Sequence, residues 1–350
     1  MKMLDFNQKI HSKVQCTSHV LVGDIGGTTT DFGILGKKNG KIILLVSIHY
    51  KSRDITNFTS VVADMLAYVK GEFGWTLRHA CFAAACPISK NATVCNLTNL
   101  NLHIRKTDLC RKTSLRHVTL INDFQAIAYG VSVLRGKQLV NAKRGKSVEK
   151  APRVVLGAGT GLGKGILLYD DKKKIYVPFS SEGGHTPLPI INKEEFQLLE
   201  FIRKRKKHNY VEWEDVLSGR GLVHMYLFAG TKKKFTKTKY SKEVHSSGYN
   251  SRLISLYKHK DKHCHAAFLM FLKFYGRCAK SFALDTMAVG GVYIAGGIAA
   301  DNAEIFTHDI FRKEFTFSEK MGHVLEKIPV TVIADYNVSL YGAAVVAFSK

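Results

Sequence analysis

The sequence predicts an α/β protein of two domains, and three features of the chain lead to this prediction. Three glycine-rich turns, at residues 23–30, 156–163 and 294–299, each follow a short apolar run of strand character. The strand–glycine–strand order of residues 20–35 recurs at 154–169, which suggests an internal duplication. A length of 350 residues leaves room for two hydrophobic cores. Because glycine allows the backbone to approach an anion closely, the three turns together predict a nucleotide held between two domains.

The elements of the first domain follow from local patterns. An amphipathic helix is expected at 58–71 and a further helical run from Phe124. The region 136–153 is basic and turn-like, and we place the exit from the first domain there. Strands are expected where apolar, β-branched residues gather, at 20–22, 32–35, 41–49, 79–85 and 118–121.

The second domain repeats the pattern and adds more helices. The segment 231–248 is polar and basic, which predicts a surface loop. A last helix is expected at 340–348, and its return to the first domain would make that domain discontinuous. Strands are expected at 154–156, 165–169, 292–295 and 329–333, and helices at 193–207, 213–217, 221–228 and 263–289.

These elements define two β-β-β-α-type units on either side of a cleft. That architecture is the two-domain actin-like ATPase fold, which is a ribonuclease H-like fold. The predicted small domain covers residues 1–135 plus about 336–350 and holds the first phosphate loop. The predicted large domain covers 136–335 and holds the second loop and the third.

Composition narrows the class of partner. The formal charge is +24, from 52 Lys and Arg against 28 Asp and Glu, which favours anionic ligands. The basic residues lie in runs such as 203–207 and 232–234 with few interleaved aromatic residues, so we expect solvated surfaces and no nucleic acid. The best apolar stretch, 266–289, carries Lys273, Arg277 and Lys280, and therefore predicts a buried helix and no membrane span. Seven cysteines without a CxxC pair, in a chain without a secretion signal, favour a cytoplasmic protein.

The first glycine-rich turn predicts a phosphate site. Asp24 can hold Mg²⁺ through the water shell of the ion, while Gly26, Gly27 and Thr28 approach phosphate oxygens. The plain alternative is a hairpin with an aspartate in its turn. In the second turn, the hydroxyl of Thr160 can donate to a terminal phosphate on the opposite wall, although an ordinary β-turn would look the same.

Asp123 is the candidate catalytic base. It stands at the carboxyl end of an apolar strand, where open α/β sheets gather their ligands. An acceptor hydroxyl must lose its proton as the new phosphate bond forms, and a nearby carboxylate can take it. Asn122 can both donate to and accept from a sugar hydroxyl. An Asn-Asp cap on the following helix explains the two residues equally well.

The fourth group of candidate residues is Glu182-Gly183-Gly184-His185. A carboxylate and an imidazole at this spacing can both face one small polyol. A metal site is disfavoured here because no second His or Cys follows at a suitable spacing. Nothing in the local sequence distinguishes Glu214 from its acidic neighbours Glu212 and Asp215.

Taken in order, these motifs resemble the bacterial-type glucokinase family over nearly the whole chain from about residue 20. The motifs that carry the resemblance are Leu21 to Thr28, Ala85-Cys86-Pro87-Ile88, Ile121 to Phe124, Gly157 to Gly163, Glu182 to His185, Val216 to Gly219 and Ile294 to Ile298.

The resemblance implies an enzyme that transfers phosphate from ATP to the 6-hydroxyl of glucose, with Asp123 as base and Asn122 beside the sugar. It assigns Glu182, His185 and Glu214 to the sugar hydroxyls, and it is the only reason for choosing Glu214. The remaining implied contacts are Thr98-Asn99 near the sugar, Gly159-Thr160-Gly161 at the phosphates and Gly296-Gly297 at the adenosine.

The chain departs from the family pattern at the first phosphate loop. Where the family commonly has Asn and, two residues later, Arg, this chain has Thr29 and Asp31. An acidic residue beside a phosphate site is expected to raise the Michaelis constant for ATP. The resemblance does not account for the basic segment 231–248.

Several alternatives stay open. The first is a non-catalytic sugar-sensing protein on the same fold, motivated by Asp31 and the basic segment. A nucleic-acid-binding protein is a second alternative, motivated only by the charge. The phosphoryl donor could be polyphosphate or ADP in place of ATP, and the sugar could include mannose or glucosamine. The oligomeric state is open too, with a homodimer as one form because members of the family are often dimers.

Overall fold

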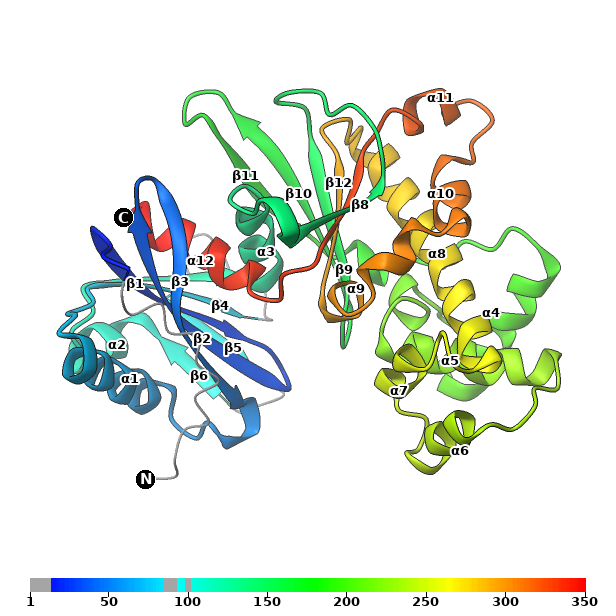
Figure 1. The fold of residues 1–350 in the computed structure, drawn as a ribbon, viewed down its shortest axis with the longest axis horizontal. Coiled ribbons are helices and arrows are strands. Elements are labelled where there is room, and N and C mark those ends of the chain that lie inside the picture. Colours follow the sequence, from blue (N-terminus) through cyan, green and yellow to red (C-terminus); the bar gives the residue numbers. More distant parts are fainter. Residues whose placement is uncertain (1–13, 85–92, 98–101) are drawn as a thin grey trace. The chain divides into compact units, whose positions relative to one another are not determined.

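The computed structural model describes residues 14–84, 93–97 and 102–350 (Figure 1). The chain divides into two compact units. Unit 1 comprises Met1–Arg135 with Asn337–Lys350, and unit 2 comprises Gly136–Tyr336. The predicted Thr98, Asn99 and 85–88 motif lie outside the described residues.

Unit 1 is built on a five-stranded sheet in the order β3-β2-β1-β4-β7. Strands β1, β2 and β3 form an antiparallel meander, and β4 and β7 run parallel to β1. The sheet strands are β1 Ser18–Ile25, β2 Thr29–Lys38, β3 Lys41–Lys51, β4 His79–Ala84 and β7 His117–Asn122, and β5 Val94–Leu97 pairs with β6 Leu102–Arg105 in a separate ribbon.

Helices cover both faces of this sheet. The alternation along a strand sends Val20 and Val22 to one side and Leu21 to the other. Val20 and Val22 pack with apolar residues of α3 and α12, whereas Leu21 shares a core with α1 and α2. The helices are α1 Phe58–Phe73, α2 Lys106–Lys112, α3 Asp123–Val131 and α12 Val338–Phe348, and a short 3₁₀ turn, η1, spans Ser52–Asp54.

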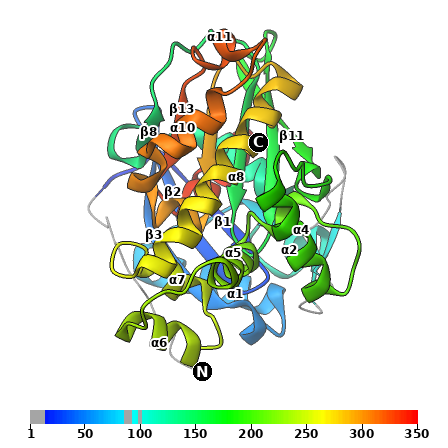
Figure 2. The same ribbon diagram turned by 90° about the vertical axis from the view of Figure 1, so that its right-hand side faces the viewer.

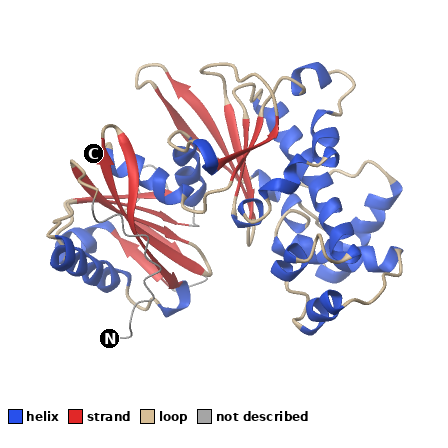
Figure 3. Ribbon diagram, viewed as in Figure 1, coloured by secondary structure: helices blue, strands red, loops and turns tan. Residues whose placement is uncertain are grey.

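Unit 2 is built on a six-stranded sheet in the order β11-β10-β9-β12-β13-β8. Figure 3 shows the strands of the chain in red and its helices in blue. Its first five positions repeat the topology of unit 1, with an antiparallel meander followed by two parallel strands. This is what the repeated strand–glycine–strand pattern predicts. The strands are β8 Leu139–Lys143, β9 Arg153–Ala158, β10 Leu162–Asp170, β11 Ile175–Ser181, β12 Val292–Ala295 and β13 Val330–Ile333.

The helices of unit 2 gather around the long helix α8, Lys262–Thr286, which packs against α5 and α10 (Figure 2). As predicted, α8 is largely buried. The α-helices around it are α4 Lys193–Lys206, α5 Gly219–Lys232, α6 Lys239–Ser246, α7 Ser251–Leu256, α9 Gly297–Ala300, α10 Asp309–Thr316 and α11 Gly322–Leu325. The 3₁₀ turns are η3 Gly136–Gln138, η4 Gly183–His185, η5 Trp213–Asp215 and η6 Ala303–Thr307.

A buried ion pair joins α8 to α4. Arg277 donates to both carboxylate oxygens of Glu195, at 2.7 and 2.9 Å. Burial raises the pKa of Glu195, but hydrogen bonds from Arg277 and Lys273 outweigh this effect and lower the pKa to about 2. The pair therefore stays charged, which buried ions require of their partners.

Three sequence predictions of local structure are wrong. The turn-like region 136–153 contains β8, because Leu139 and Val140 pair with the β13 edge. The expected surface loop 231–248 contains α6, which is capped by Thr238 and anchored by the buried side chain of Val244. The expected helix 213–217 is the shorter turn η5. Within the described parts of the chain, no helix is both long and apolar enough to cross a lipid bilayer.

Candidate active site

The first phosphate-type loop is the tight turn between β1 and β2. The backbone N–H of Gly26 donates to the carbonyl oxygen of Thr29 at 2.9 Å, which closes the turn. Gly27 and Thr28 are exposed at its tip. A methyl group built on Gly27 would meet no atom of the described residues within 4 Å. The loop therefore presents open backbone, as a phosphate site needs.

Ser52 holds this loop from the end of β3, and sequence reasoning missed it. Its hydroxyl donates to the carbonyl oxygen of Gly26 at 2.7 Å, and its backbone N–H donates to that of Thr28 at 3.0 Å. The Ser52 side chain is buried and also contacts the hydroxyl of Thr30 at 2.9 Å. No local signal marks a serine that lies 26 residues away from its acceptor.

Asp24 lies at the end of β1 in an acidic environment. The hydroxyl of Ser339, on α12, donates to its carboxylate at 2.5 Å. Burial raises the pKa of Asp24 to about 7, and the charges of Asp123 and Asp31 add to the rise while Ser339 opposes it. Asp31 pairs with His49 across the β2–β3 register. A partly buried carboxylate with acidic neighbours is a donor set that suits a hard divalent cation such as Mg²⁺.

Asn122 and Asp123 form the start of α3. The Oδ1 atom of Asn122 accepts the backbone N–H of Phe124 at 2.9 Å, and its own N–H donates to Gln125 at 3.2 Å. Asp123 Oδ1 also accepts from Phe124, at 2.9 Å. The helix-cap role that the sequence left open is therefore present. The roles of Asp123 as base and of Asn122 at the sugar stay predictions.

The second phosphate-type loop is the turn between β9 and β10. The N–H of Gly159 donates to the carbonyl oxygen of Gly161 at 2.8 Å. The N–H of Gly219, at the start of α5, donates to the carbonyl oxygen of Gly159 at 2.9 Å. Thr160 is exposed at the tip. The loop is thus fixed to a helix terminus while its threonine remains accessible.

Glu214 is joined directly to this loop. Its Oε2 atom accepts the backbone N–H of Leu162 at 3.0 Å, and Arg220 contacts its Oε1 atom at 3.1 Å. A Cβ atom on Gly161 would lie 2.5 Å from Oε2 of Glu214, so any larger residue here would displace the carboxylate from this position. Local sequence does not distinguish Glu214 from its acidic neighbours, whereas the structure places its carboxylate against this loop. Its role at the sugar stays a prediction.

His185 lies beside two further acidic residues. Its Nδ1 atom is 3.1 Å from Oε1 of Glu212, and its Nε2 atom is 4.0 Å from Oε2 of Glu182. The hydrogen bond with Glu212 is the main cause that raises the pKa of His185; burial opposes it, and the charges of Glu212, Glu214 and Glu182 add to it. The structure therefore gathers the three predicted sugar residues of unit 2, together with Glu212.

Three candidate metal ligands lie together at this place, where the sequence disfavours a metal ion. Candidate ligand atoms of His185, Glu212 and Glu214 all lie within 4.8 Å of one another, so ligand count alone does not exclude an ion. These groups also contact Arg220 and a backbone N–H. Such a network of donors and acceptors equally suits the hydroxyls of a sugar.

The third glycine turn follows β12, which pairs with β9, so the second and third loops leave neighbouring strands. Gly296 has φ of +89°, and a Cβ there would lie 2.7 Å from the carbonyl oxygen of Ala158. Both facts require glycine. Tyr336 lies beside Gly297 and pairs with Asp301, two residues that the sequence did not single out.

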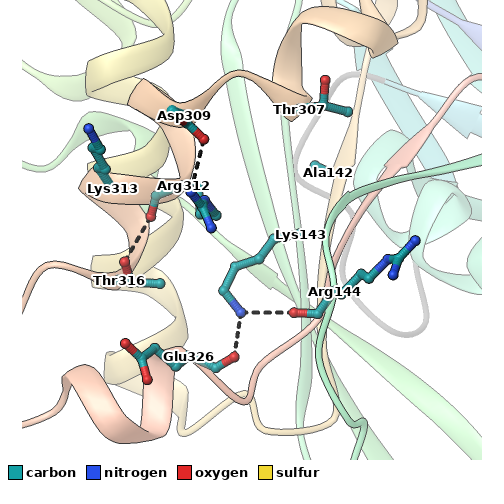
Figure 4. A pocket seen from close by; sticks show the side chains of 9 residues that line it. All are labelled: Ala142, Lys143, Arg144, Thr307, Asp309, Arg312, Lys313, Thr316 and Glu326. Atoms are coloured by element: carbon teal, nitrogen blue, oxygen red, sulfur yellow. Dashed lines mark hydrogen bonds and ion pairs between the residues drawn. The ribbon is translucent and has the colours of Figure 1, made fainter.

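A separate cavity of about 720 Å³ opens in unit 2 (Figure 4). Lys143 donates there to the carbonyl oxygens of Arg144 and Glu326 at 3.1 and 2.6 Å, and Arg312 pairs with Asp309 at 2.9 Å. Two of its cations thus already have acceptors. None of the predicted site residues is among its lining residues, which are Ala142, Lys143, Arg144, Thr307, Asp309, Arg312, Lys313, Thr316 and Glu326.

The fold defines the class of this protein. A solved glucokinase from an Antarctic psychrotroph matches with a TM-score of 0.77 and 27% identity, covering 95% of this chain and 99% of that one. A ROK family glucokinase from Streptomyces griseus, solved in complex with glucose and AMPPNP, shares the fold at 18% identity and a TM-score of 0.64, covering 95% of this chain and 100% of that one. The protein is a sugar kinase with the two-domain actin-like ATPase fold, as the sequence predicts.

The family is shown by sequence as well. The Glucokinase family profile matches residues 21–350. A glucokinase from Nostoc sp. strain PCC 7120 is 32% identical over 342 residues, which cover 94% of this chain and 98% of the relative. The chain belongs to the glucokinase family, and the resemblance drawn from its motifs is confirmed.

Proposed function

We propose that this chain transfers the terminal phosphoryl group of ATP to the 6-hydroxyl of glucose. The observation that carries the proposal is the bond between Glu214 and the second phosphate loop in unit 2. One oxygen of the Glu214 carboxylate accepts a hydrogen bond from the loop backbone, so a candidate sugar-binding residue is held against the candidate phosphate-binding turn. A group that binds a sugar hydroxyl is thereby fixed with respect to the group that binds the transferring phosphate.

The sugar would bind to Glu182, His185 and Glu214. Hydroxyl groups both donate and accept, and charged partners make the strongest such bonds. Exposure of the Glu182 and His185 side chains, at 78% and 53%, leaves them accessible to a ligand. Asn122, and Thr98 with Asn99, would add contacts from unit 1. Whether mannose or glucosamine also binds depends on these same groups.

Asp123 would accept the proton of the 6-hydroxyl as the new phosphate bond forms. Its charge raises the pKa of Asp24, so it lies within electrostatic range of the candidate metal residue. Asp24 would hold Mg²⁺ through water. When bound, Mg²⁺ neutralises charge on the phosphate oxygens.

The phosphates of ATP would lie on the exposed turns of the two loops, at Gly26, Gly27 and Thr28 and at Gly159, Thr160 and Gly161. Gly296 and Gly297 would contact the adenosine, because their loop leaves a strand next to the second loop. Asp31 would oppose the negative phosphates. Its pairing with His49 offsets part of this repulsion when His49 is protonated.

A coupled assay for glucose 6-phosphate tests the proposal, with purified protein, glucose and either Mg-ATP or polyphosphate as donor. Product with ATP supports it. Product with polyphosphate alone would be consistent with the proposed sugar site but would show that ATP is not the phosphoryl donor. Glucose binding without product from either donor would favour the sugar-sensing alternative, to which the family membership lends less support.

The setting of the reaction is part of the same proposal. A kinase that makes glucose 6-phosphate from ATP would act in the cytoplasm, at the entry of glucose into glycolysis. A homodimer is proposed on the family resemblance alone, and sedimentation of the purified protein measures it.

A further inference from the structure

We propose that Glu212 is a positioning residue whose carboxylate orients the ring of His185 and thereby sets the affinity of the enzyme for the hexose. The inference rests on the proposed function, because it takes His185 as a sugar-binding residue. Neither a motif nor the family resemblance points to Glu212.

His185 and Glu212 are in direct contact, and neighbouring residues hold both segments in place. Nδ1 of His185 lies 3.1 Å from Oε1 of Glu212, whose side chain is only 18% exposed. Two further contacts fix the segments that carry them. The hydroxyl of Tyr210 donates to the carbonyl oxygen of His185 at 2.8 Å, and Pro187 forms an isolated β-bridge with Glu212.

The backbone of Glu212 is held in place by Asp215. Its backbone N–H donates to Oδ2 of Asp215 at 3.0 Å. Asp215 is buried, and Lys206 binds the same oxygen at 2.5 Å. The Lys206–Asp215 pair therefore holds the backbone of Glu212 in the position from which its carboxylate contacts His185.

A carboxylate at Nδ1 decides what His185 presents to a ligand. An ionised carboxylate only accepts hydrogen bonds, so Nδ1 must carry a proton. The Nε2 atom is then an acceptor in the neutral ring and a donor in the imidazolium ion. A sugar hydroxyl can pair with either form, and a ring held in one orientation keeps Nε2 in place for that bond.

The charges around His185 act in the same direction. Glu212, Glu214 and Glu182 face the ring and raise the pKa of His185, with the hydrogen bond that His185 donates to Glu212 as the largest cause and burial opposing it. Arg220, the nearby cation, is bound to Glu214. Removal of the Glu212 charge is therefore expected to lower the pKa of His185 and to weaken the hydrogen bond that orients the ring.

Steady-state kinetics of the full chain test the proposal with Glu212→Gln and Glu212→Asp. We expect Glu212→Gln to raise the KM for glucose about fivefold, because the amide oxygen still accepts from Nδ1 but a neutral hydrogen bond is about half as strong as a charged one. The KM for ATP and kcat should stay within about twofold of wild type, since Glu212 contacts neither phosphate loop. Glu212→Asp restores a carboxylate and should recover part of the affinity.

A matched control separates this effect from the general loss of a glutamate. Glu243→Gln removes a carboxylate that accepts the Tyr257 hydroxyl at 2.6 Å in the same unit. It should leave the KM for glucose unchanged. ¹⁵N NMR of the histidine rings, with His185→Gln to assign the signal among 15 histidines, gives a readout that a purely structural role would not move. In Glu212→Gln, the His185 signal should titrate at lower pH.

Three outcomes would overturn the inference. They are an unchanged KM for glucose in Glu212→Gln, an unchanged titration of the His185 ring, or equal losses in Glu212→Gln and Glu212→Asp that follow a fall in Tm. If the wild-type chain makes no glucose 6-phosphate, the proposed function fails, yet the NMR titration still decides whether Glu212 controls His185.

Discussion

Replacement of Gly161 by alanine tests the link between the sugar residues and the second phosphate loop. The added methyl carbon would lie 2.5 Å from Oε2 and 3.2 Å from Cδ of Glu214. Real carbon atoms do not approach so closely, so the Glu214 carboxylate must move. Movement breaks its bond from the backbone N–H of Leu162 and disturbs its contact with Arg220.

The expected magnitude follows from the bonds that are lost. A hydrogen bond to a charged group contributes about 1.5 to 3 kcal/mol. The contact with Arg220, whose side chain is 56% exposed, adds less than about 1 kcal/mol. If the sugar binds only when the carboxylate is in its original position, this free energy is lost from binding. Since about 1.4 kcal/mol corresponds to a factor of ten, the affinity for glucose should fall by about 10-fold to 100-fold at most.

The assay is the KM for glucose at saturating Mg-ATP, together with Tm to establish that the variant is folded. Gly159→Ala is the matched control in the same loop, because a Cβ there meets no described atom within 4 Å. It is expected to change the KM for ATP more than the KM for glucose. A Gly161→Ala enzyme with wild-type affinity for glucose would refute the proposed coupling of Glu214 to the loop.

Three further predictions concern unit 1. Asp123→Asn should lower kcat by at least about two orders of magnitude while glucose still binds, as loss of a general base does; near-normal turnover would contradict the assignment. Asp31→Asn should lower the KM for ATP about fivefold, because removal of an exposed like charge is worth about 1 kcal/mol; a raised KM would show that the Asp31–His49 pair helps the nucleotide. The pKa of Asp24, about 7 in the folded chain against an ordinary value of 3.8, makes wild-type stability fall as pH rises from about 4 to 7, because the folded state then binds the extra proton. Asp24→Asn should remove this loss of stability, which is at most about 4 kcal/mol, and should also abolish activity. Denaturant titrations measure the free energy of unfolding of both proteins. An equal fall of that free energy in both proteins across this pH range would disprove the prediction.

The positions of the three glycine turns were predictable from sequence because each depends on local chemistry. An apolar strand that ends in glycine identifies its own turn, and the two copies of the pattern predicted the repeated sheet topology. The long helix α8 was predicted because its apolar residues keep the helical period over 25 residues. The predictions of local structure were wrong where local composition and tertiary packing disagree. One case is β8, which is a strand because it pairs with the edge of β13.

The partners of the site residues were beyond local reasoning. Ser52 lies 26 residues from Gly26, and Glu214 lies 52 residues from Leu162. Glu212 and Glu214 look alike in sequence, yet one contacts His185 and the other contacts a loop backbone. Asn122 differs from these residues, because its helix cap could be predicted from local sequence and is present in the structure. That cap does not decide whether the neighbouring Asp123 is a catalytic base.

The sequence by itself therefore determined the fold class, the family and the places where the backbone is open to phosphate. These features follow from the positions of glycine and from the periodicity of apolar residues in strands and helices. Both depend on residues that lie close together in the chain. Only the tertiary structure decided which carboxylates face which ring, loop or cation. Hydrogen bonds and ion pairs act over about 3 Å, and folding alone brings residues such as Glu214 and Leu162 to that distance.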